Sequence, residues 1–175
     1  MNIHLRKFSN IKIKKAMIKY IENGDIFSLE GVNSFAHGCN CAGSMGRGIA
    51  VQFRKKFPDM FKNYRQMCLN GNFLPGNVYD YDYGIGHVYN LATQQHYCIP
   101  GQLAKLEYIE SSLEKMMLLA EIDKVQSIAL PKIGAGHGGL RWQDVKSVIE
   151  KVAANHQKVD LYVVENFVEH RELRR

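Results

Sequence analysis

Hydrophobic positions along the chain follow two patterns, and each predicts one kind of element. Short apolar or alternating runs are typical of strands, and they cover residues 16–22, 34–39, 77–83, 87–93, 127–131 and 160–165. Longer segments with apolar residues three or four positions apart predict helices, and these cover residues 49–57, 59–68, 102–122 and 142–154.

The order of these elements predicts the fold class. Only Gly84-Ile85-Gly86 separates residues 77–83 from residues 87–93, and so short a connection with glycine predicts an antiparallel hairpin. The later order of strand, helix and strand requires a parallel crossover. Residues 127–131 (SIALP) are apolar almost throughout, which is typical of a sheet covered on both faces. We therefore expect an α/β fold with a mixed, mainly parallel central sheet between helices.

Length and cysteine content limit the class of protein. A chain of 175 residues suits one domain. The four cysteines form no CxxC pair, which predicts reduced thiols, and neither a metal site nor a cofactor is expected. No apolar run approaches the length of a membrane-spanning helix, and the basic N-terminus is followed by no apolar stretch. We expect a cytoplasmic protein with no membrane partner.

The net charge of +6 leaves two partners open. A basic protein can bind nucleic acid, but much of the excess lies at the two chain ends, where basic residues are usually just solvated. The same charge would favour a small anionic ligand. Charge alone therefore does not choose between these partners.

Two glycine-rich runs occupy matching positions. Residues 37–50 read HGCNCAGSMGRGIA and residues 133–140 read IGAGHGGL, and each lies between a predicted strand and a predicted helix. Glycine lets backbone approach a ligand closely, and a helix N-terminus attracts phosphate through unpaired N–H groups. Two such loops on neighbouring strands could hold a diphosphate between them, although tight turns alone would also explain the glycines.

Known phosphate-binding patterns fit less well. The chain has no G-x-x-x-x-G-K-[ST] sequence, which excludes the P-loop of nucleotide triphosphatases. Gly134, Gly136 and Gly139 do satisfy G-x-G-x-x-G. A dinucleotide-binding fold, however, carries that pattern in its first strand-turn-helix unit, and here it comes near the end of the chain.

Three blocks taken together resemble the macro domain, a family that binds ADP-ribose. They are GDIF at residues 24–27, HGCNCAGSMGRGIA at residues 37–50 and LPKIGAGHGGLRW at residues 130–142. HGCN, MGRGIA and TQQHY are most similar to the branch of ADP-ribose 1''-phosphate phosphatases and terminal ADP-ribose glycohydrolases. The resemblance implies a three-layer α/β/α macro domain over residues 16–168, an N-terminal extension at residues 1–15 and a basic tail at residues 169–175.

The resemblance also implies a role for individual residues. Asp25 would accept a hydrogen bond from the adenine amino group, Asn40 would face the distal ribose, and the two glycine loops would enclose the diphosphate. The implied ADP-ribose-binding residues are Asp25, Ile26, Asn40, Gly46, Arg47, Gly48, Ile49, Thr93, Gln94, Gly134, Ala135, Gly136, His137, Gly138, Asn166 and Phe167.

The chain departs from the glycohydrolases where their chemistry is carried out. Gln94 stands where they have a catalytic lysine, and Gly138 stands where they have a catalytic aspartate, which argues against a lysine-dependent mechanism. The phosphatases fit better, and they imply His37, Asn40 and His137 as catalytic residues, with a histidine as general acid or base. A histidine hydrogen-bonded to backbone at a strand end is the alternative for His37.

Three functions follow from these observations. The first is a hydrolase acting on the distal ribose of ADP-ribose, with ADP-ribose 1''-phosphate or ADP-ribosylated protein or nucleic acid as substrate. The second is a module that binds ADP-ribose without chemistry. The third is a nucleic-acid-binding protein that uses its basic ends, although no recognised nucleic-acid motif occurs in the sequence.

Overall fold

The computed structural model describes residues 16–170, so the predicted extension at residues 1–15 and the last part of the predicted tail lie outside them. In chain order the described elements are β1 (Ile18–Gly24), β2 (Phe35–Asn40), α1 (Ala50–Lys56), α2 (Pro58–Leu69), β3 (Val78–Asp82), β4 (His87–Gln94), α3 (Leu106–Ile122), β5 (Ser127–Pro131), α4 (Trp142–Asn155) and β6 (Asp160–Phe167). Among residues 16–170, no helix combines the length and apolarity needed to cross a membrane.

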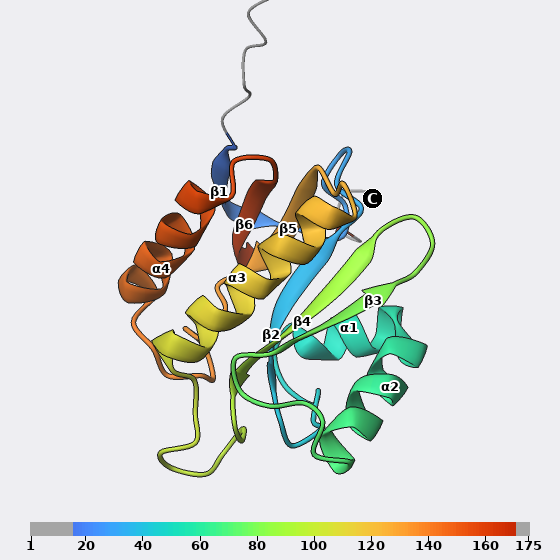
Figure 1. Ribbon diagram of the computed structural model, residues 1–175, viewed down its shortest axis with the longest axis vertical. Helices are drawn as coiled ribbons and strands as arrows, with labels where there is room; N and C mark the ends of the chain where they lie inside the picture. Colours follow the sequence, from blue (N-terminus) through green and yellow to red (C-terminus); the bar gives the residue numbers. More distant parts are fainter. Residues whose placement is uncertain (1–15, 171–175) are drawn as a thin grey trace, which may run out of the picture.

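The strands form one sheet with the order β1-β6-β5-β2-β4-β3 (Figure 1). β3 pairs antiparallel with β4, and every other neighbouring pair is parallel. The predicted hairpin and the mixed, mainly parallel sheet are both confirmed. Because β5 and β2 are neighbours, the glycine runs that follow them begin at the same edge of the sheet.

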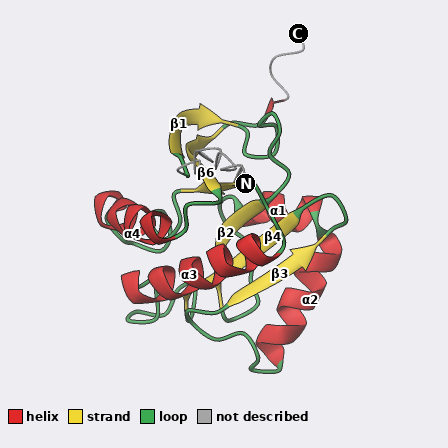
Figure 2. Ribbon diagram, turned by 45° about the horizontal axis from the view of Figure 1, so that its top comes forward, coloured by secondary structure: helices red, strands yellow, loops and turns green. Residues whose placement is uncertain are grey.

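Helices cover both faces of the sheet. Figures 1 and 2 show α3 and α4 on one face, with α1 and α2 on the other. Alternate residues of β5 face these two layers: Ile128 and Leu130 belong to the core beneath α3 and α4, and Ala129 belongs to the core beneath α1 and α2. This explains the continuous apolar run that predicts a doubly covered strand, and it confirms the three-layer architecture.

The sequence-based expectation needs correction at the starts of α3 and α2. The helix predicted over residues 102–122 begins only at Leu106. Ala104 forms an isolated antiparallel bridge with Gln94, and the Lys105 N–H donates to the Thr93 carbonyl. The segment before Leu106 is thus extended alongside the end of β4. Pro58, expected only to stop the preceding helix, is the first residue of α2, a position where proline loses no helical hydrogen bond.

Candidate ligand-binding site

A cavity of about 300 Å³ lies where β2, β4 and β5 end. Its lining comes from both glycine loops and from Thr93 and Gln94 at the end of β4. The volume lies at the lower end of the usual range for small-molecule sites. The position, at the carboxyl ends of parallel strands, is where α/β sheets usually bind ligands. The two loops that the sequence places far apart therefore share one site.

The first glycine loop is held by the side chain of Asn40, which is buried. The Asn40 Oδ1 atom accepts hydrogen bonds from the backbone N–H groups of Ala42 (3.0 Å) and Ser44 (3.2 Å). Its Nδ2 atom donates to the Ser44 carbonyl at 2.8 Å. From α2, the Tyr64 hydroxyl lies 2.7 Å from the Asn40 carbonyl and 3.0 Å from Oδ1. Asn40 lines the cavity, and its polar atoms also shape the loop, while its contact with the distal ribose stays a prediction.

The rest of the first loop also lines the cavity. Gly46, Arg47, Gly48 and Ile49 all belong to the lining, as the resemblance implies. Gly48 has φ 56°, a left-handed conformation that residues with a Cβ rarely adopt. α1 begins two residues later, at Ala50. Glycine at position 48 thus allows the turn into the helix.

The second glycine loop packs so tightly that two of its glycines have no room for a side chain. A Cβ on Gly134, which has φ 69°, would lie 2.6 Å from Ile109 Cδ1. A Cβ on Gly138 would lie 2.5 Å from the Gly134 carbonyl oxygen and 2.8 Å from Ala104 Cβ. Both glycines line the cavity together with Gly136 and the exposed His137. Ala135, also predicted, is half-buried and is absent from the lining.

Unpaired backbone donors are concentrated in these loops. Among hydrogen bonds within residues 16–170, none is donated by the N–H groups of Gly46, Arg47, Gly48, Ile49, Gly134, Gly136, His137 and Gly138. Among the described residues, the charged side chains of the lining are those of Arg47 and Lys132, and no Asp or Glu belongs to it. Free N–H groups and a cavity lining whose charged side chains are cationic suit an anionic ligand, and a phosphate in particular.

His37 is placed differently from the expectation. Its side chain is fully buried, stacks on Phe53 of α1 with ring centroids 4.0 Å apart, and lies 2.8 Å (Nε2) from Asn90 Oδ1. It does not line the cavity. Burial lowers its pKa to about 4, even though the hydrogen bond to Asn90 acts in the opposite direction. This placement argues against the predicted role as general acid or base. The hydrogen-bonded strand histidine is the better interpretation, with a side-chain amide rather than backbone as its partner.

The cysteine nearest the cavity is also neutral. Cys39 lines the cavity and is buried. Burial raises its pKa well above the ordinary thiol value, and the nearby Cys68 and Cys41 add to the shift. A thiol in that state is a poor nucleophile. All four cysteines are free, and Cys39 does not offer covalent catalysis.

The predicted adenine contacts lie outside the cavity. Asp25, Ile26, Asn166 and Phe167 do not line it; they gather where β1 and β6 end, with Gly24 opposite Phe167 in the register. The carboxylate of Asp25 accepts hydrogen bonds from the backbone N–H of Phe27 and from the Ser28 hydroxyl. Their contact with adenine stays a prediction.

The lining includes residues that the sequence did not single out as ligand contacts. Ser44 and Met45 lie between Gly43 and Gly46, Tyr97 follows the end of β4, and Lys132 directly follows β5. Lys132 could have been found from the sequence, because a cation at the start of a glycine loop is a natural phosphate partner. Tyr97 and Met45 carry no comparable signal.

Comparison with known proteins matches both glycine loops to one protein family. The family model described as Macro domain matches residues 36–149. The DNA ADP-ribosyl glycohydrolase of Thermus aquaticus is 33% identical over 138 residues, covering 77% of this chain and 38% of the relative. The ADP-ribose 1''-phosphate phosphatase of Debaryomyces hansenii is 32% identical over 184 residues, covering 85% of this chain and 100% of the relative.

A solved structure of a related protein has the same fold. The macrodomain of Mycobacterium tuberculosis DarG superposes with a TM-score of 0.77 at 30% identity, covering 86% of this chain and 98% of that one. The chain spans only about two fifths of the length of the DNA ADP-ribosyl glycohydrolases that it matches. The shared fold, the two glycine loops and the matched residues together establish that the chain belongs to the macro domain family.

Proposed function

We propose that this protein binds ADP-ribose, with the diphosphate lying between the two glycine loops. The observation that carries the proposal is the set of unpaired N–H groups in two loops that line one cavity, whose charged side chains are Arg47 and Lys132. A diphosphate presents acceptor oxygens on two sides, so loops from neighbouring strands can bind both phosphates. The distal ribose then lies near Asn40, and the adenine extends toward Asp25.

The proposal extends to hydrolysis at the distal ribose, with ADP-ribose 1''-phosphate as substrate. The Debaryomyces hansenii relative, matched along its full length, carries the name of that phosphatase. Water would attack phosphorus, the bond from phosphorus to the ribose 1'' oxygen would break, and that oxygen would take a proton. His137 is the histidine that lines the cavity, and imidazole transfers protons readily near neutral pH. We assign it the role of general acid.

Phosphorus NMR with ADP-ribose 1''-phosphate tests this assignment. Wild-type protein should release inorganic phosphate, and His137→Ala should lower kcat by about 100-fold or more, the usual contribution of a positioned acid. His96→Ala is the matched control, because His96 does not line the cavity and its loss should leave kcat nearly unchanged. Equal kcat in the wild type and His137→Ala would remove His137 from the mechanism.

A second substrate is ADP-ribosylated DNA. It is favoured by the three relatives at 33% identity named DNA ADP-ribosyl glycohydrolase and by the net charge of +6. Gln94 and Gly138 stand at the positions implied for the catalytic lysine and aspartate of glycohydrolases, so any cleavage here would not use a lysine adduct. Incubation with an ADP-ribosylated oligonucleotide, followed by electrophoresis, separates the two reactions. Binding of ADP-ribose without turnover of either substrate would leave a module that only binds.

We further propose that the protein acts in the cytoplasm. Its four cysteines are all free, and Cys98 is exposed. An exposed free thiol is typical of a reducing compartment. Localisation of a fluorescently labelled chain in its own cell tests this proposal.

A further inference from the structure

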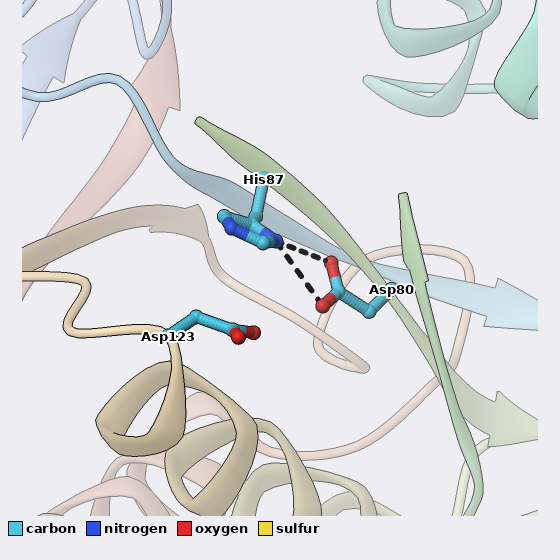
Figure 3. A group of neighbouring side chains, drawn as sticks. All are labelled: Asp80, His87 and Asp123. Atoms are coloured by element: carbon cyan, nitrogen blue, oxygen red, sulfur yellow. Dashed lines mark hydrogen bonds and ion pairs between the residues drawn. The ribbon is translucent and has the colours of Figure 1, made fainter. Parts of the chain in front are cut away.

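A second group of side chains lies at the opposite edge of the sheet. Asp80, His87 and Asp123 are distant in sequence, yet their ligand atoms all lie within 4.8 Å of one another. Figure 3 shows the three side chains converging, with the carboxylate of Asp80 bonded to the imidazole of His87. The Nδ1 atom of His87 lies 2.9 Å and 3.1 Å from the two carboxylate oxygens of Asp80. A nitrogen and two carboxylates in this arrangement match the ligands of a divalent cation.

Three separate elements supply the group. Asp80 lies in β3, His87 is the first residue of β4, and Asp123 caps the C-terminus of α3. The side chains of Asp80 and His87 are only 20% and 16% exposed, so the strands fix them firmly. The C-terminus of a helix carries partial negative charge, and the end of α3 therefore adds to the attraction for a cation.

Tyr89 provides an independent observation. Its side chain is fully buried, and its hydroxyl is the buried side-chain polar atom in residues 16–170 that has no hydrogen-bond partner. Tyr89 lies opposite Asp80 in the hairpin register, and its ring stacks on His87 with centroids 5.7 Å apart. Leaving a buried hydroxyl without a hydrogen-bond partner costs free energy of folding. A water molecule bound to an ion would supply that partner.

Solvent can reach the group. A cavity of about 350 Å³ is lined by His87 and Asp123 together with the residues that begin β5 and precede β2. It therefore opens at the amino ends of the strands, whereas the glycine loops lie at their carboxyl ends. A hydrated ion could enter without passing through the proposed ADP-ribose site.

From this geometry we infer that Asp80, His87 and Asp123 bind one divalent transition-metal ion, with Zn²⁺ as the probe of choice. Imidazole among the ligands favours such an ion over Mg²⁺ or Ca²⁺, which prefer oxygen. The ion takes the place of the hydrogen bond between His87 and Asp80 and joins the hairpin of β3 and β4 to the end of α3. Its role is structural, because the group is remote from the proposed catalytic residues.

Calorimetric titration of the full chain with Zn²⁺ tests the inference. One equivalent should bind, and Asp123→Asn should weaken binding at least tenfold. Asp123 is exposed, so its replacement should leave the fold intact, as circular dichroism can verify. Glu114→Gln is the matched control, since Glu114 also bonds a histidine, His156, at 2.7 Å but belongs to no group of three metal-ligating residues in the described chain.

Two further readouts separate this site from other zinc-binding groups. Co²⁺ at the proposed site should give visible absorption without a thiolate charge-transfer band, whereas ligation by the exposed Cys98 would produce that band. Bound Zn²⁺ should raise Tm in wild-type protein and in Glu114→Gln, and by a smaller amount in Asp123→Asn, because weaker binding stabilises the fold less. The inference is overturned by the absence of Zn²⁺ binding, by equal affinity in Asp123→Asn, or by a thiolate band.

Discussion

The imidazole of His137 lies directly against Gly48, so the two glycine loops meet across the cavity. A Cβ built on Gly48 would lie 3.5 Å from His137 Cδ2, which is ordinary contact distance. The two residues belong to loops that follow different strands, β2 and β5. A methyl group therefore fits at position 48, whereas a larger side chain directed toward His137 would crowd the imidazole.

Replacing Gly48 by valine should weaken ADP-ribose binding at least tenfold, because the extra methyl groups press on His137 and enter the space proposed for the diphosphate. Gly71→Val is the matched control. Gly71 also has a positive φ, 70°, but a Cβ there would meet nothing within 4 Å, and Gly71 does not line the cavity. Both variants should lose about 1 kcal/mol or more of stability from left-handed strain. Calorimetry with ADP-ribose should detect weaker binding in Gly48→Val alone.

Replacing Gly138 by alanine should destabilise the protein by about 1–3 kcal/mol, because overpacking forces backbone to move. The added Cβ would lie 2.5 Å from the Gly134 carbonyl oxygen, whereas a Cβ on Gly136 would meet nothing within 4 Å. Urea unfolding of Gly138→Ala beside Gly136→Ala measures the difference. Equal midpoints would mean that the second loop adjusts freely. If the prediction holds, an aspartate at position 138 would require the loop to rearrange.

Much of the site could be predicted from the sequence because its strongest signals are local. A glycine run between an apolar strand and an amphipathic helix needs no knowledge of the rest of the chain, and both runs line the cavity. The apolar pattern also predicts residues 127–131 as a strand with the bounds of β5. Local signals fail where residues distant in the sequence determine the structure of a segment. The helix predicted from residue 102 begins only at Leu106, because the preceding residues form hydrogen bonds with the end of β4.

Side-chain environment was the part that local pattern could not predict. His37 precedes the first glycine loop and matches a catalytic position by resemblance. Its burial depends on Phe53 in α1 and Asn90 in β4, neither of which is its sequence neighbour. The proposed metal-ligating group also depends on tertiary packing. Asp123 lies close to Asp80 and His87 only because α3 packs on the sheet.

Replacing Tyr64 by phenylalanine should loosen the first loop without touching the ligand. The hydroxyl of this fully buried residue bonds both the carbonyl and the Oδ1 atom of Asn40, and losing a buried hydrogen bond costs about 1–3 kcal/mol. We expect a lower free energy of unfolding and weaker ADP-ribose binding. Tyr81→Phe is the control, because the Tyr81 hydroxyl has no hydrogen bond to any atom of residues 16–170. Equal losses in both variants would contradict the prediction.

Acid should destabilise the protein through His37. The Asn90 side chain donates from Nδ2 to the carbonyls of Tyr79 and Val88, so its Oδ1 accepts from His37 Nε2. Burial lowers the pKa of His37 from 6.5 to about 4. Between these values the unfolded chain binds a proton that the folded protein does not. Stability from the neutral imidazole is therefore complete above the unfolded pKa and falls as the pH drops toward the folded pKa.

The expected loss at pH ~5 is about 2 kcal/mol, since each unit of pKa shift corresponds to about 1.4 kcal/mol. Urea unfolding of the wild type and His37→Gln at pH ~7 and pH ~5 isolates this contribution. Glutamine keeps a donor for Asn90 and does not titrate, so the variant should start less stable but lose about 2 kcal/mol less on acidification. If both proteins lose the same amount, His37 is protonated in the folded state, and a role in proton transfer would have to be reconsidered despite its burial.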